Sequence, residues 1–169
     1  MSYAQGVARE IEVLVMPCAK ALGSYGALVV CAPLLREFLV NHCRSLIFAS
    51  ALPPVVLAWT AYQLRRLPEL EGRRARLLAN TRALRAALGL AVPSGWVAPI
   101  VPLVIGENAP MLALAKRLRE VGIVVGAVRY PTVARGAAQL RLCVNALLSD
   151  EAVQWVAREI IKGRADVGA

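Results

Sequence analysis

Lys20 is the residue of this 169-residue chain whose setting most clearly indicates chemistry. It lies between two apolar runs, Ile11 to Met16 and Leu28 to Cys31, and it is the only lysine among the first 115 residues. Its neighbours are alanine, leucine and glycine, which lower the hydration of the side chain and disfavour the ammonium form. A neutral amine can form a Schiff base with an aldehyde cofactor. The alternative is an ordinary strand-end lysine that extends to solvent.

Short strands and a helix are predicted around this lysine. The two apolar runs have the length of buried strands, and Pro17 ends the first. The small residues beside Lys20 allow the backbone to approach a bulky planar ligand closely. Proline is favoured in the first turn of a helix, so a helix is expected from Pro33 to about His42. Leu46 to Ala49 has the composition of a third strand.

A long helical pattern follows, and then strands alternate with helices. The helical pattern runs from Val55 to about Leu88, and Pro68 should kink or divide it. Strands are expected at Ile100 to Ile105, Ile123 to Val128 and Gln139 to Val144. This order predicts a small α+β layer with its helices on one face of a sheet.

Two helices are expected within that layer. Asn108 can cap a helix that begins near Pro110 and stops at Gly122. Ser149 can cap the last helix, and Gly163 is expected at its end. The buried face of the first of these helices should consist of Met111, Leu114, Leu118 and Val121.

The net charge of +9 comes from 17 arginines and only three lysines. A cluster of arginines in the long helical pattern is either a face for an acidic ligand, such as nucleic acid or coenzyme A, or a solvated helix surface. Aromatic residues are only 5% of the chain, and no nucleic-acid motif accompanies the cluster, so no nucleic-acid partner is expected. The cluster comprises Arg65, Arg66, Arg73, Arg74, Arg76, Arg82 and Arg85.

Membrane insertion and metal binding are also disfavoured. Hydrophobic residues make up 58% of the chain, but prolines interrupt both long uncharged runs, Ser45 to Leu64 and Ala86 to Gly106. The four cysteines lack the spacing of a metal site, and nothing near Met1 resembles a signal peptide. We therefore expect a cytoplasmic protein with reduced cysteines, no membrane partner, and His42 on the surface.

Three segments together resemble one known family. The first is Lys20 to Gly26 between two strands, and the second is Phe48 to Pro54, an aromatic residue, a small hydroxyl residue and Leu-Pro-Pro. The third is Val128 to Val133, followed by Gln139 to Leu142. In order and spacing they resemble the C-terminal part of the α-oxoamine synthases. These are pyridoxal-phosphate (PLP) enzymes of the aspartate-aminotransferase fold, and the nearest likeness is to the 8-amino-7-oxononanoate synthases of biotin synthesis.

The resemblance implies an α/β fold with two parts. Residues 1–60 would be the tail of the PLP-binding large domain, and residues 61–169 the small α+β C-terminal domain. In the family, the aspartate that pairs with the pyridine nitrogen and the histidine that stacks on the ring precede the part matched here. The chain is therefore expected to be the C-terminal part of a synthase, inactive alone and homodimeric in its full-length form.

The resemblance also assigns site residues. Lys20 matches the lysine that binds PLP and moves protons at the substrate. Ser50 matches a hydroxyl residue that reaches the cofactor phosphate of the other subunit, and Arg129 matches the arginine that pairs with the substrate carboxylate. Arg141 matches an arginine close by. Pro17 departs from the family, which has a phosphate-binding Thr or Ser at that position, because proline offers neither a hydroxyl nor an amide.

The implied activity joins an amino acid, expected to be L-alanine, to a pimeloyl-CoA-like acyl-CoA with loss of CO₂. Two alternatives stay open at this point. One is a fold type I aminotransferase, and the other is a non-catalytic fragment that kept the fold and lost the site.

Overall fold

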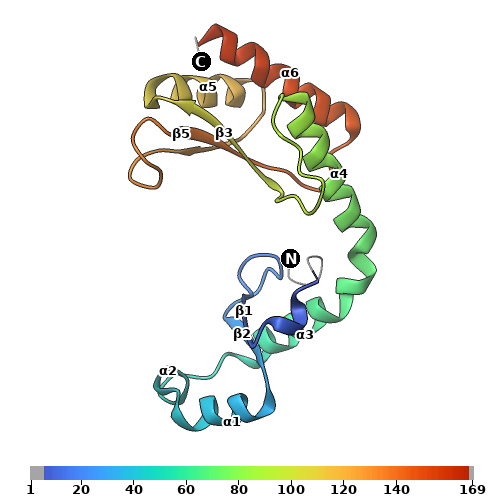
Figure 1. Ribbon diagram of the computed structural model, residues 1–169, viewed down its shortest axis with the longest axis vertical. Helices are drawn as coiled ribbons and strands as arrows, with labels where there is room; N and C mark the ends of the chain where they lie inside the picture. Colours follow the sequence, from blue (N-terminus) through green and yellow to red (C-terminus); the bar gives the residue numbers. More distant parts are fainter. Residues whose placement is uncertain (1–5, 168–169) are drawn as a thin grey trace. The chain divides into compact units, whose positions relative to one another are not determined.

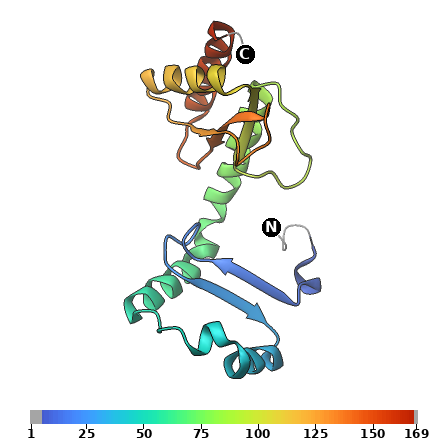
Figure 2. The ribbon, with the colours of Figure 1, turned by 90° about the vertical axis from the view of Figure 1, so that its left-hand side faces the viewer.

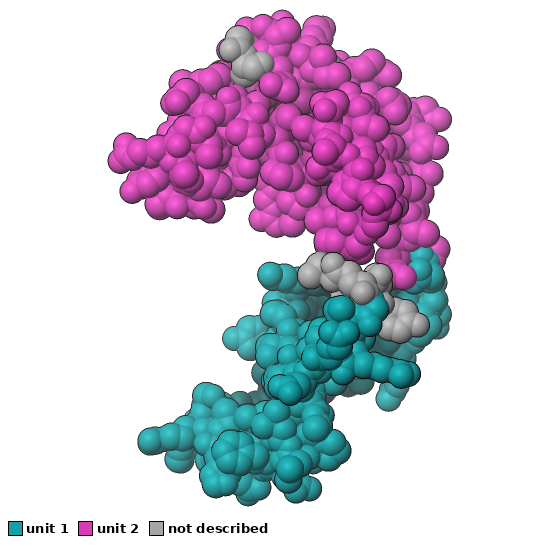
Figure 3. All heavy atoms as spheres, viewed as in Figure 1, with its two compact units in different colours: residues 1–71 teal, residues 72–169 magenta. Residues whose placement is uncertain are grey.

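Residues 6–167 are described in a computed structural model, in which the chain divides into two units, residues 1–71 and 72–169 (Figure 3). The first unit is built on an antiparallel pair of strands, β1 (Val13–Pro17) and β2 (Ala27–Cys31), drawn side by side in Figure 2. Both strands lie where the apolar runs predicted them. The prediction that they are buried is wrong, since none of their residues is buried and their valines Val13, Val15, Val29 and Val30 are 44–58% exposed. In their register Val13 lies opposite Cys31 and Pro17 lies opposite Ala27. The residues between Pro17 and Ala27 therefore form the turn that connects the two strands.

Helices complete the first unit. α1 (Pro33–His42) confirms the helix predicted from its leading proline, and His42 is exposed and stacks on Phe38. α3 (Pro54–Arg66) is followed by a 3-10 turn, η2 (Leu67–Leu70), which contains Pro68, so the predicted division of the long helical pattern is confirmed. A further 3-10 turn, η1 (Ala8–Glu10), precedes β1.

The strand predicted at Leu46 to Ala49 is wrong. A one-turn helix, α2 (Arg44–Ile47), covers the first half of this segment, and a turn and a bend follow at Phe48 and Ala49. The amides of Leu46 and Ile47 both donate to the carbonyl of Cys43. Periodicity cannot distinguish a strand from a helical turn over so few apolar residues. Local backbone hydrogen bonds satisfy these amides without a partner strand.

The second unit is a three-stranded antiparallel sheet with helices packed on it (Figure 1). The strands are β3 (Ile100–Gly106), β4 (Gly126–Val128) and β5 (Ala138–Cys143), in the order β3-β5-β4. Helices α5 (Asn108–Glu120) and α6 (Asp150–Asp166) lie on one face, as predicted, and α4 (Glu71–Ala87) leads into the unit. The side chains buried between sheet and helices include Val101, Leu103, Met111, Leu114, Leu118, Leu140, Val153 and Ile160.

Several boundary predictions in this unit are wrong. Glu107 occupies the N-cap of α5, and Asn108 is already helical and makes no capping hydrogen bond. Val121 follows the helix and is 40% exposed, although Gly122 does stop it with a positive φ of 87°. β4 begins only at Gly126, because residues 123–125 lie outside the ladder that pairs β4 with β5.

Gly163 does not end the last helix, because α6 continues to Asp166. A Cβ atom at position 163 would lie 2.6 Å from Leu114 Cδ1 and 3.2 Å from Arg117 Nε. Distances this short require the neighbours to move, so glycine here permits the close approach of α6 to α5. A packing contact, and not a C-cap, explains this glycine.

Three arginines of α4 bind neighbouring segments through an ion pair and hydrogen bonds to backbone carbonyls. Arg76 pairs with Asp150 at 2.9 Å and also donates to the Leu148 carbonyl at 3.2 Å. Arg82 donates to the Gly95 carbonyl at 2.7 Å, and Arg85 Nε donates to the Ala91 carbonyl at 2.6 Å. These side chains therefore hold the loop at 91–95 and the start of α6 against α4. In residues 6–167, no helix is both long and apolar enough to cross a membrane.

Ser149→Ala is expected to destabilise the second unit by about 1 kcal/mol. The Ser149 side chain accepts a hydrogen bond of 3.2 Å from the Ala152 amide, which confirms the predicted cap of α6. Alanine leaves that amide without its partner, whereas Ser149→Asp keeps an acceptor and adds a favourable charge at the helix N-terminus. Urea denaturation measures both variants, and equal midpoints for wild type and Ser149→Ala would contradict this role.

Candidate cofactor and substrate site

Lys20 lies in the turn that connects β1 and β2, residues 18–26, here called the lysine turn. Backbone hydrogen bonds organise it: the Cys18 amide donates to the Gly26 carbonyl at 2.9 Å, and the Ser24 amide donates to the Cys18 carbonyl at 3.0 Å. The Gly23 amide donates to the carbonyl of Lys20 itself at 3.1 Å. The lysine is therefore held in an ordered segment.

The expectation that apolar neighbours dehydrate Lys20 is wrong in this structure. Two other residues of the lysine turn take the buried positions, since Cys18 is 1% and Leu22 8% exposed. Lys20 lies between them in the sequence and is exposed. Ala19 and Ala21, the immediate neighbours of Lys20, are exposed as well, so their apolar character does not remove the amine from water.

The Leu-Pro-Pro end of the segment from Phe48 to Pro54 packs against the lysine turn. A Cβ atom at Gly26, where φ is 80°, would lie 2.8 Å from Cδ1 of Leu52. Pro53 then occupies the N-cap of α3, and Pro54 is its first residue. Leu-Pro-Pro thus has a structural role: the leucine lies beside the lysine turn, and the two prolines start the next helix.

Gly26→Ala is expected to destabilise the first unit by about 1–2 kcal/mol, since alanine at positive φ is strained and its methyl group would press on Leu52. Gly72→Ala is the matched control, because a Cβ atom there meets nothing within 4 Å and α4 favours alanine. Denaturation curves should shift to lower urea for the first variant only. A shift of equal size in both would show that the lysine turn does not depend on this glycine.

Three side chains of α3 also contact the lysine turn. Thr60 Oγ1 lies 2.6 Å from Ser24 Oγ, Trp59 Nε1 donates to the Gly23 carbonyl at 3.0 Å, and Gln63 Nε2 donates to the Leu22 carbonyl at 3.4 Å. Sequence reasoning missed all three. Each pair is separated by 36 or 41 positions, and the local pattern carries no signal for such contacts.

Ser50 is exposed in the segment between α2 and α3. It lies two residues before Leu52, the residue that packs beside the lysine turn. Lys20 and Ser50 therefore belong to the same unit. The other two predicted site residues, Arg129 and Arg141, belong to the second unit.

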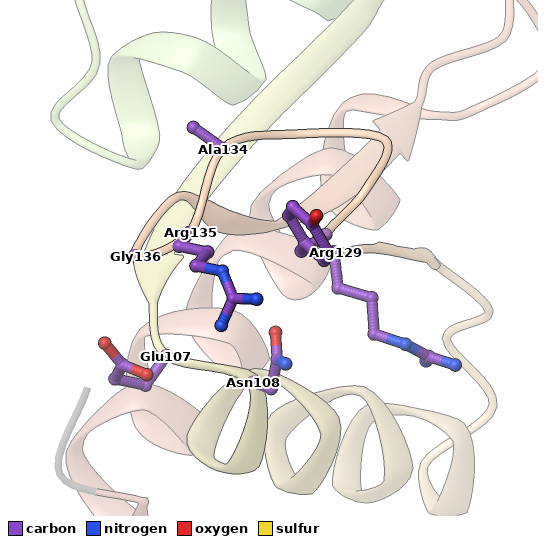
Figure 4. Close-up of a pocket in the computed structure, with 7 residues that line it drawn as sticks. Glu107, Asn108, Arg129, Ala134, Arg135 and Gly136 are labelled. Carbon is purple, nitrogen blue, oxygen red and sulfur yellow. The ribbon is translucent and has the colours of Figure 1, made fainter.

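Arg129 follows β4 and is exposed. It lines a pocket of about 280 Å³, together with the N-terminal end of α5 and the loop before β5. Figure 4 shows Arg129 extending away from Arg135, so the two guanidinium groups do not converge on one point. Arg135 instead lies over the Tyr130 ring, 4.7 Å from its centre. The full lining is Glu107, Asn108, Arg129, Tyr130, Ala134, Arg135 and Gly136.

Arg141 lies on β5, the central strand, opposite Pro102 of β3 and Gly126 of β4. It is exposed on the sheet face opposite the buried Leu140 and Leu142. It lines a different and more apolar pocket of about 690 Å³, to which Trp96, Val128 and Thr132 contribute. The structure therefore places the two predicted carboxylate-binding arginines at separate pockets of the same unit.

The fold defines the class of protein. Solved structures of the PLP-dependent transferase fold match 93–99% of this chain, which confirms the predicted fold class. The structure of serine palmitoyltransferase (SPT) with PLP as internal aldimine superposes with a TM-score of 0.87 at 26% identity, and the match covers 99% of this chain and 43% of that one. The 8-amino-7-oxononanoate synthase of Francisella tularensis gives 0.77 at 28% identity, covering 93% and 47%.

The chain belongs to the aminotransferase class I and II family, whose model matches residues 2–160. It is 41% identical over 158 residues to the 8-amino-7-oxononanoate synthase of Chlorobaculum parvum, covering 91% of this chain. It is 42% identical over 148 residues to the enzyme of the same name in Methylococcus capsulatus, covering 86%. The chain spans about 40% of the length of these curated relatives.

Proposed function

We propose that this chain is the lysine-bearing part of a PLP-dependent acyltransferase of the 8-amino-7-oxononanoate synthase type. The proposed reaction joins L-alanine to a pimeloyl-CoA-like thioester with loss of CO₂. The observation that supports it is an exposed lysine on an ordered turn between two strands, in a chain about 40% identical to synthases of that name. The full-length enzyme is proposed to be a cytoplasmic homodimer.

The residues of the lysine turn fit the aldehyde end of PLP. The exposed amine of Lys20 is available to a carbonyl carbon, and Gly23, three residues further on, leaves open space where a side chain would stand. The phosphate end fits this turn less well: Pro17 has no donor, and the Ser24 hydroxyl is engaged with Thr60. Phosphate binding is therefore assigned to Ser50 of the partner subunit in the full-length dimer.

Each remaining residue has a proposed role. Lys20 binds the cofactor and then moves the proton at the α-carbon of the amino acid. Arg129 offers a planar guanidinium that binds a carboxylate through two parallel hydrogen bonds, so it is assigned the carboxylate that leaves as CO₂. Arg141 is assigned to the substrate nearby. When bound, PLP supplies a sink for the electron pair that remains at the α-carbon.

Borohydride trapping tests the proposal. The chain is incubated with PLP, reduced, digested and mapped by mass spectrometry, so that hydride fixes the cofactor on whichever amine has reacted with it. A stoichiometric adduct on Lys20, with Lys116 and Lys162 unmodified, is expected. Absence of labelling, or labelling spread over all three lysines, would show that this chain forms no specific site.

An aminotransferase is the second candidate, since the matching family model is named for that reaction. The two reactions differ in their products. A synthase releases CO₂ and coenzyme A from alanine and an acyl-CoA, whereas an aminotransferase converts the amino acid into its keto acid. Measuring both products with the full-length enzyme distinguishes the two candidates. The chain alone is expected to give neither product in the same assay.

A further inference from the structure

We propose that α3 acts as a positioning element for Lys20, with the Thr60 hydroxyl as its central contact. The three contacts of α3 fall on Leu22, Gly23 and Ser24, the residues two to four positions after the lysine. This inference rests on the proposed function, because it concerns the presentation of the Lys20 amine to the aldehyde of PLP. It assigns roles to Thr60, Trp59 and Gln63, which the family motifs do not include.

The direction of the central hydrogen bond follows from counting protons. Thr60 is only 6% exposed, and its hydroxyl donates to the Val56 carbonyl one helical turn earlier, at 2.8 Å. A hydroxyl has one proton and two lone pairs, so Thr60 Oγ1 must accept in its 2.6 Å contact with Ser24. Ser24 is therefore the donor. Thr60 thus joins the backbone of α3 to the side chain of the lysine turn.

This hydrogen bond connects to the backbone frame of the lysine turn. The Ser24 amide donates to the Cys18 carbonyl, and the Cys18 amide donates to the Gly26 carbonyl, so Ser24 is tied to both ends of the turn. Trp59 adds a bond to the Gly23 carbonyl, and the amide of that same glycine donates to the Lys20 carbonyl. Through these hydrogen bonds, α3 restrains the backbone of the lysine turn, which carries the Lys20 side chain.

The start of α3 is itself fixed against the lysine turn. Leu52 lies beside Gly26, and the two prolines that follow it open the helix. Without the contacts further along α3, the exposed lysine would stay accessible but its backbone would sample more conformations. A small reagent requires only access, whereas a bulky planar cofactor requires a defined direction of approach. Loss of positioning should therefore affect the reaction with PLP and spare the reaction with a small aldehyde.

The test compares three substitutions in the full 169-residue chain. Thr60→Val removes the acceptor with little change of shape, and Thr60→Ser restores the hydroxyl. Thr81→Val is the matched control, because Thr81 is also buried and its hydroxyl donates to the carbonyl four residues earlier, at 2.7 Å, but it lies in the other unit. Hydrogen exchange of residues 18–26 is measured without PLP, and borohydride trapping is measured with PLP.

Thr60→Val should speed exchange of the lysine turn about fivefold, the equivalent of one net hydrogen bond, and lower the Lys20 adduct by a similar factor. Thr60→Ser and Thr81→Val should match wild type in both measurements. Reductive methylation of Lys20 by formaldehyde should be unchanged in every variant, with Lys116 and Lys162 as internal references.

Unchanged exchange or unchanged trapping in Thr60→Val would overturn the inference, as would an equal loss of formaldehyde methylation. Failure of the proposed function gives a different result. In that case the wild-type chain itself shows no preference of PLP for Lys20. The exchange measurement still decides, without any cofactor, whether α3 holds the lysine turn.

Discussion

Lys20→Arg is expected to abolish the PLP adduct of this chain completely. Arginine keeps the positive charge and much of the length of lysine, and position 20 is exposed, so the substitution should leave the fold intact. A guanidinium is not deprotonated in proteins and does not react with the aldehyde as an amine does. Peptide mapping after borohydride reduction measures the loss, and far-UV circular dichroism measures the fold.

The chain offers two matched controls for this substitution. Lys116 in α5 and Lys162 in α6 are also exposed, and arginine at either position should leave the adduct on Lys20 unchanged. If Lys20→Arg still trapped PLP at the wild-type stoichiometry, the reactive amine would lie elsewhere. The assignment of Lys20, and the proposed function with it, would then be wrong.

The sequence predicted the elements around Lys20 well, because local signals specify them. β1 and β2 follow apolar runs, and α1 begins at the proline that marked its first turn. Residues whose role depends on a distant neighbour were predicted poorly. Glycine is a common residue at a helix end, so Gly163 was predicted to end α6. Its role depends instead on Leu114, 49 positions earlier, whose side chain leaves no room for a Cβ atom at position 163.

The candidate site shows the same contrast between features that local sequence predicts and features that depend on distant residues. Its lysine, its serine and its two arginines were assigned from motifs, and these assignments stay predictions. The exposure of Lys20 was not predictable from composition, because Cys18 and Leu22 take the inward positions of the turn. The contacts of α3 could not be inferred either, since a hydroxyl such as that of Thr60 bonds its own helix equally well. Only the fold brings Thr60 to Ser24.

Leu140→Ala is expected to have the largest effect on stability, a loss of about 2–5 kcal/mol. Leu140 lies on β5, the central strand of the second unit, opposite Leu103 of β3 and Ala127 of β4. Both leucines are buried beneath the helices, at 0% and 1% exposure. Truncation removes apolar contacts and leaves a cavity in a sheet of only three strands, which has few neighbours able to fill it.

Leu147→Ala provides the same chemical change outside the core, since Leu147 is 85% exposed. It should alter the free energy of unfolding by less than about 0.5 kcal/mol. Urea denaturation followed by circular dichroism, extrapolated to water, measures both variants against wild type. Because the two substitutions delete the same atoms, only the buried position should carry the cavity cost. Equal losses would mean that Leu140 is not packed as the structure places it, and that the sheet is not the centre of this unit's stability.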